Sequence, residues 1–177
     1  MIAADLGRYR TIGLVAVAAF VSTVFLANWA IERYGFVSVG FGLTAPAGVY
    51  FAGLAFTLRD ITHDTLGRRW VLLAIVAGAL LSSLVSPQFA LASGTAFLFS
   101  ELFDFAVYAP LRKRHWIGAV VASNIVGLVA DSILFLWLAF ESLAFLEGQI
   151  VGKAWMTLLA IPFLLLWRRH LGRPGWV

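Results

Sequence analysis

Long apolar runs dominate this chain of 177 residues. A helix needs about 20 mostly apolar residues to cross the hydrocarbon core of a bilayer. The chain is 62% hydrophobic and 12% charged, which is about half the charged content of a typical soluble domain. The sequence therefore predicts an all-α integral membrane protein, in which residues 1–177 form one bundle of six transmembrane helices. The predicted spans are roughly residues 11–31, 44–66, 70–87, 92–111, 116–140 and 150–167.

The basic residues predict the orientation of this bundle. Lysine and arginine are enriched in the short cytoplasmic loops of membrane proteins. Arg33 and Lys153 would lie on one side of the predicted spans, and all the other basic residues would lie on the opposite side. We therefore expect both termini in the cytoplasm and a multi-pass protein of the inner membrane. The basic residues on the expected cytoplasmic side are Arg8, Arg10, Arg59, Arg68, Arg69, Arg112, Lys113, Arg114, Arg168, Arg169 and Arg173.

Several classes of function are not supported by the sequence. The net charge of +4 does not indicate a nucleic-acid-binding protein, because the basic residues form short clusters and no continuous stripe. The chain has no cysteine, which excludes disulfides and thiolate chemistry. His63 with Asp60 and Asp64 could coordinate a metal, but this motif is short and unspecific. We expect neither an enzyme nor a bound cofactor or metal.

Residues 57–70, with the sequence TLRDITHDTLGRRW, are unusually rich in charge. We interpret this stretch as the cytoplasmic end of the second helix and the tight turn that follows it. Thr44 is expected to cap the start of that helix, with Pro46 in its first turn, where a missing N–H costs little. Gly67 is suited to end the helix.

Two acids in this charged stretch need a separate explanation. Asp60 and Asp64 are expected near the C-terminus of a helix, where the macrodipole disfavours negative charge. One interpretation is that both acids pair with nearby arginines at the membrane interface. The other is that they form a gate at the cytoplasmic mouth of the bundle.

Three further acids fall inside predicted spans. Glu101 and Asp104 lie in the fourth span and Asp131 in the fifth. Placing a charged side chain at mid-bilayer costs about 2.5–3.5 kcal/mol on insertion scales. No lysine or arginine is predicted inside the membrane to pair with these acids. We therefore expect them to face a cavity and to bind a proton or a ligand rich in hydrogen-bond donors.

Helical spacing groups these acids with aromatic and amide side chains. The fourth span carries two acids between two aromatic rings on one stripe, and the fifth carries an amide and an acid. The alternative is that the polar groups only hold the helices of a non-transporting scaffold together. The candidate substrate-binding residues are Asn28, Phe97, Glu101, Asp104, Asn124 and Asp131, and the candidate gate residues are Asp60 and Asp64.

Four stretches of the chain are similar to one known family. LANWAI, LRDITHDTLGRR, GTAFLFSELFDFAVYAPLR and ASNIVGLVADSILFLWLAF resemble, in the same order, the vitamin-uptake-like transporters known as queuosine precursor transporters. The resemblance covers about residues 25–140. It implies a six-helix fold similar to the substrate-binding subunits of energy-coupling-factor vitamin transporters. It also implies import of 7-cyano-7-deazaguanine or 7-aminomethyl-7-deazaguanine, and it carries over Asn28, Asp60, Glu101, Asp104 and Asp131.

The chemistry of such a ligand fits the acids and the rings. A guanine-like base presents adjacent N1–H and amino donors, which one carboxylate can accept as a pair. Aromatic rings can stack on the faces of the base. The sequence leaves open a solitary importer, a substrate-binding subunit that needs partner subunits, and a scaffold. It contains no ATP-binding motif, so any ATP coupling must come from a partner module, and the chain could also form a homodimer.

Overall fold

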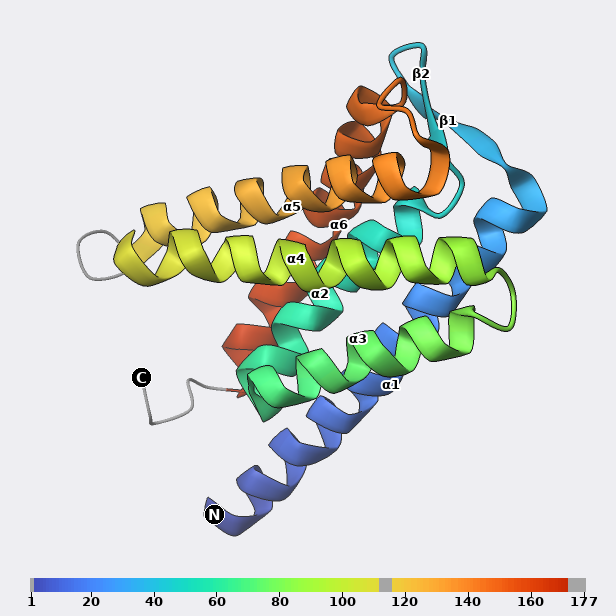
Figure 1. The fold of residues 1–177 in the computed structure, drawn as a ribbon. Coiled ribbons are helices and arrows are strands. Elements are labelled where there is room, and N and C mark those ends of the chain that lie inside the picture. Colours follow the sequence, from blue (N-terminus) through green and yellow to red (C-terminus); the bar gives the residue numbers. More distant parts are fainter. Residues whose placement is uncertain (1, 112–115, 172–177) are drawn as a thin grey trace.

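The computed structural model describes residues 2–111 and 116–171. Within these residues the chain forms six helices and one two-stranded antiparallel sheet (Figure 1). The mostly helical architecture predicted from the sequence is confirmed. The elements are α1 (Ile2–Tyr34), β1 (Phe36–Gly40), β2 (Leu43–Pro46), α2 (Val49–Leu66), α3 (Arg68–Ser82), α4 (Pro87–Leu111), α5 (Trp116–Phe140) and α6 (Leu146–Leu171).

Three segments among the described residues are long and apolar enough to cross a membrane. They are Tyr9–Tyr34 in α1, Pro87–Tyr108 in α4 and Ala122–Phe140 in α5. Several such segments in one chain agree with a multi-pass helical membrane protein. Helix α3 has only 15 residues, and the 18 residues of α2 include three charged side chains. Length and composition alone therefore do not identify these two helices as spans.

The hairpin of β1 and β2 was not expected from the sequence. The prediction that the second helix begins at residue 44 is wrong, because α2 begins at Val49 after the N-cap residue Gly48. Thr44 and Pro46 do not start a helix; they lie in β2, where they pair with Ser38 and Phe36. The backbone has positive φ at the tip, with 95° at Gly40 and 74° at Gly42. Glycine adopts such angles without steric cost, which favours a tight turn over a helix.

Other predicted boundaries also change by a few residues. Helix α3 ends at Ser82 instead of residue 87, α4 begins at Pro87 instead of 92, and α6 begins at Leu146 instead of 150. Proline suits the first turn of α4, since its missing N–H would have no helical partner there. The predicted end of α2 is confirmed, because Gly67 follows its last residue with φ of 86° and donates its N–H to the carbonyl of His63.

The helices run between two ends of the bundle. In Figure 1 the start of α1, the α2–α3 junction and the last turns of α6 gather at the lower left, and α4 also ends on the left. The hairpin and the α3–α4 and α5–α6 connections lie on the opposite side. Helix α4 packs mainly on α5, and α2 packs on α1 and α6. Of the basic residues from which sidedness was inferred, Arg112, Lys113, Arg114 and Arg173 lie outside the described residues, and Arg59 and Lys153 are buried.

Two glycines allow α2 and α6 to approach closely. A Cβ atom added at Gly53 would lie 2.7 Å from Cβ of Met156 and 3.1 Å from Cα of Lys153. A Cβ atom added at Gly152 would lie 2.6 Å from Cγ2 of Val49. Small residues have this role at helix interfaces in membranes, where close backbone packing supplies the attraction. The contact places the backbone of Lys153 directly against α2.

We predict that Gly53→Ala destabilises the protein. Overpacking of a close contact typically costs about 1–3 kcal/mol, and the backbone of α6 cannot rotate away as a flexible side chain could. Thermal unfolding in detergent can be monitored by the loss of the monodisperse peak in size-exclusion chromatography. Gly53→Ala should have a lower unfolding midpoint than the wild-type protein. Gly7→Ala is the matched control, because no atom lies within 4 Å of a Cβ added there. Equal midpoints for both variants would contradict the packing argument.

Candidate functional site

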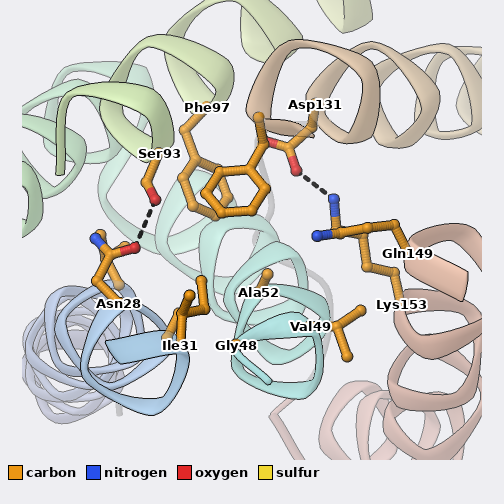
Figure 2. Close-up of a pocket in the computed structure, with 13 residues that line it drawn as sticks. Asn28, Ile31, Gly48, Val49, Ala52, Ser93, Phe97, Asp131, Gln149 and Lys153 are labelled. Carbon is orange, nitrogen blue, oxygen red and sulfur yellow. Dashed lines mark hydrogen bonds and ion pairs between the residues drawn. The ribbon is translucent and has the colours of Figure 1, made fainter. Parts of the chain in front are cut away.

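Polar side chains from α1, α4, α5 and α6 meet at a small buried cavity (Figure 2). The cavity has a volume of about 20 Å³ and is also lined by the start of α2. Its walls combine apolar side chains with a few convergent polar groups, as ligand sites generally do. The polar residues of its lining are Asn28, Ser93, Asp131, Gln149 and Lys153.

The cavity contains an ion pair between α5 and α6. Nζ of Lys153 donates to Oδ2 of Asp131 at 2.5 Å and to Oγ of Ser132 at 2.8 Å. Lys153 is only 1% exposed. From the sequence, Lys153 was counted with Arg33 as a basic residue of the side opposite the cytoplasm, and Asp131 was left without a cation. Both expectations are wrong, because the two side chains form a buried pair. Because α6 begins at Leu146, Lys153 lies about two turns inside the helix.

Two amide side chains bring further hydrogen-bonding atoms to the same cavity. Oγ of Ser93 donates to Oδ1 of the fully buried Asn28 at 2.8 Å. Among the described residues, Nδ2 of Asn28 and Oε1 of Gln149 are buried and have no hydrogen-bond partner. Buried polar atoms are nearly always paired in folded proteins. The cavity therefore offers one donor and one acceptor that a ligand can satisfy.

Aromatic rings complete the cavity wall. Phe97 and Phe135 both line it, and Phe97 lies between the Asn28–Ser93 hydrogen bond and the Asp131–Lys153 pair in Figure 2. Behind the cavity, the ring of Phe97 packs edge-on against Phe20 at 6.0 Å and contacts Phe56 at 5.7 Å. These contacts hold Phe97 in one orientation, so its ring presents a fixed apolar surface.

A second polar cluster surrounds Arg59, which is buried within the bundle. Its Nη2 donates to Oδ1 of Asp60 at 2.7 Å and to Oδ1 of Asn124 at 3.3 Å. Its Nη1 lies 3.2 Å from Oε2 of Glu101. This last contact is a charge pair without hydrogen-bond geometry, since Oε2 has no hydrogen-bond partner among the described residues. The cluster links α2, α4 and α5.

The expectation that the intramembrane acids lack cations is therefore wrong for Glu101 as well as for Asp131. Arg59 is not an interfacial anchor, because its side chain turns inward and is only 6% exposed. Its position near the end of α2 suggested an interface, but long arginine side chains can extend along an apolar surface to reach a distant partner.

The predicted site residues thus fall into two groups. Asn28, Phe97 and Asp131 line the cavity, whereas Asp60, Glu101 and Asn124 surround Arg59. The two other predicted residues do not line the cavity. Asp104 is half-buried beside Gly127, and Asp64 is exposed one turn beyond Asp60 on α2. Oδ1 of Asp104 is buried and has no hydrogen-bond partner within the described part of the chain.

The family comparison covers a part of the chain that carries most of the polar lining of this cavity. Residues 83–167 match the family whose description is "Putative vitamin uptake transporter". Over these residues the chain is similar to that family. The matched region contains Ser93, Phe97, Asp131, Gln149 and Lys153 of the cavity. No curated protein and no solved structure matches the chain.

Similarity to an uptake transporter family makes the buried polar groups candidates for recognition of a small molecule. It does not indicate an enzyme. Among the described residues, no group of three or more histidine, aspartate or glutamate side chains could hold a metal ion. His63 itself is exposed near the end of α2.

Four residues of these polar clusters were not predicted as site residues: Arg59, Ser93, Gln149 and Lys153. Gln149 and Lys153 are four positions apart, which places them on one face of a helix. That spacing was informative, but the predicted start of the sixth span at residue 150 separated the two. Arg59 was counted as a cytoplasmic charge although it follows the apolar first half of α2 directly and lies seven residues before the end of that helix.

We predict that Arg59 and Glu101 are strongly coupled in their contributions to the free energy of unfolding. Arg59→Met should destabilise the protein by about 3–5 kcal/mol, because it leaves a buried carboxylate without a counter-charge. Adding Glu101→Gln should recover much of this loss, with a coupling of about 0.5–3 kcal/mol. Chemical unfolding of the four proteins of this cycle in detergent provides the measurement.

Asp60→Asn is the control for that cycle. The side chain of Asp60 is 45% exposed, and ion pairs with an exposed partner contribute at most about 1 kcal/mol. Losses from Arg59→Met and Glu101→Gln that simply add would show that the two groups do not interact.

Proposed function

We propose that this protein imports a queuosine precursor, 7-cyano-7-deazaguanine or 7-aminomethyl-7-deazaguanine, across the inner membrane. Its family supports uptake of a small molecule, and the sequence resemblance supports a deazapurine. The observation that carries the proposal is the composition of the cavity. One acid, two amide atoms without partners and two aromatic rings meet there.

These groups complement the edges and faces of a guanine-like base. Lys153 uses Oδ2 of Asp131, and a carboxylate has acceptor capacity for further donors. Asp131 and Oε1 of Gln149 would accept the N1–H and amino donors, while Nδ2 of Asn28 would donate to the ring carbonyl. Phe97 and Phe135 would contact the faces of the base. Of the three acids considered from sequence, we favour Asp131, because Glu101 and Asp104 are not part of the cavity lining.

Binding requires the walls of the cavity to separate. A volume of about 20 Å³ holds roughly one water molecule, whereas ligand pockets usually measure about 300–1,000 Å³. We propose that the Arg59 cluster is part of the gate on the cytoplasmic side, with Asp60 as the gate residue predicted from sequence. Opening between α2 and α4 there must separate Arg59 from Glu101. Asp64 is kept in the proposed gate only by its position one turn beyond Asp60.

The orientation of the bundle is part of this proposal. Six spans with both termini in the cytoplasm would place the hairpin and residues 83–86 outside. The arrangement of helix ends in Figure 1 supports it, as do the basic residues that cluster at one end.

Single-cysteine labelling tests this orientation, because the natural chain contains no cysteine. Phe41→Cys at the hairpin tip and Leu84→Cys in the α3–α4 turn replace side chains that are each 80% exposed. A membrane-impermeant maleimide should label both in intact cells. His63→Cys, at the opposite end, should react only after the cells are lysed. The reverse pattern would overturn the proposed orientation.

Competition for binding tests the proposed ligand. A 7-deazaguanine should compete with the labelled precursor at least about tenfold better than an analogue lacking the 2-amino group. The reason is that the missing donor leaves a buried acceptor unpaired, at a cost of roughly 1–3 kcal/mol. Asp131→Asn should abolish binding, because it presents a donor to the donors of the base. Glu101→Gln and Asp104→Asn are the matched controls and should retain the discrimination between the two analogues.

Equal competition by both analogues would contradict the proposal that a carboxylate and amides recognise the 2-amino group. Absence of binding by the purified wild-type protein would support the scaffold alternative. Uptake of labelled base by cells expressing only this chain would support a solitary importer. Uptake that requires additional subunits would support a substrate-binding subunit.

A further inference from the structure

The cavity has balanced charge. Asp131 and Lys153 are the ionisable residues of its lining, and they are 3% and 1% exposed. Their charges cancel within a direct ion pair. The rest of the lining consists of apolar side chains, amides, a hydroxyl and glycine. Whatever charge a ligand carries is therefore added to a site that is neutral and poorly solvated.

A cationic ligand would disturb this balance. Its charge would have no free counter-charge in the lining, because Asp131, the acid that lines the cavity, already pairs with Lys153. A buried charge without a counter-charge is strongly disfavoured. A neutral ligand of the same shape leaves the Asp131–Lys153 pair balanced.

Among the described residues that line the cavity, Asp131 is the one acid beside Lys153. Glu101, which is outside this lining, is held by Arg59 at 3.2 Å. Both Lys153 and Arg59 lie over the ring of Phe56, at 5.9 Å and 5.2 Å from its centre. A displaced Lys153 would therefore approach another cation. These contacts keep the ammonium group beside Asp131.

We propose that Lys153 is a specificity-determining residue, which makes the cavity select a neutral deazapurine over one that bears an amine cation. This inference rests on the proposed function, since it takes the cavity as the site of the base. Among the two precursors, the nitrile is neutral. The aminomethyl group is an alkylamine and is protonated at neutral pH, as lysine is. The importer would thus favour the nitrile.

A matched pair of ligands isolates charge from size. 7-Hydroxymethyl-7-deazaguanine and 7-aminomethyl-7-deazaguanine have nearly the same shape, and only the second is a cation. The wild-type protein in detergent should bind the hydroxymethyl compound at least about tenfold more tightly. Lys153→Gln should reduce this ratio at least tenfold or invert it, because Asp131 then offers an unpaired negative charge. Lys153→Arg keeps the charge and should keep the preference for the neutral compound.

The outcomes separate this inference from the proposed function. If the wild-type protein binds neither compound, the proposed function fails, and the inference fails with it. If it binds both equally, the proposed function stands and the role of Lys153 is overturned. The role of Lys153 is also overturned if folded Lys153→Gln keeps the wild-type ratio of affinities for the two compounds. A lysine with a purely structural role would leave that ratio unchanged. If Lys153→Gln does not fold, the wild-type comparison alone decides, and equal affinities reject the inference.

Discussion

The ion pair of Asp131 and Lys153 constrains how the helices around the cavity are arranged. Each charge is buried among apolar helices, where it would be costly without the other. The pair therefore requires α5 and α6 to face each other at this level. Gly53 and Gly152 then bring α2 against α6, and Asn28 of α1 reaches the same cavity. The polar cavity exists because these close contacts converge on one pair of charges.

The long helices were predictable because each corresponds to a long apolar run in the sequence. Helix α5 has the predicted bounds of 116–140, and α4 ends at residue 111 as predicted. The hairpin at residues 36–46 was missed for a physical reason. A short apolar segment is compatible with strand or helix by periodicity alone, and here the positive φ angles at Gly40 and Gly42 favour the turn.

The site was predictable in part. Acids inside a span stand out, so Asp131 and Glu101 were found from sequence. Their cations were not, because pairing between helices leaves no local pattern: Lys153 is 22 residues from Asp131, and Arg59 belongs to a different helix from Glu101. Lys153 was counted as a charge at the end of the sixth span, because that span was predicted to begin at residue 150, whereas α6 begins at Leu146. Small errors in helix boundaries thus become large errors in the chemistry inferred for a membrane site.

The two polar clusters are mechanically connected. Phe97 of the cavity and Glu101 of the Arg59 cluster are one turn apart on α4, so they move together if that helix moves as a rigid body. The ring of Phe56 lies against Phe97, under Arg59 and under Lys153. A displacement of α4 that widens the cavity at Phe97 therefore also changes the distance between Glu101 and Arg59. Packed side chains with discrete arrangements transmit such displacements, so a ligand large enough to open the cavity must also act on the charge cluster proposed as the gate.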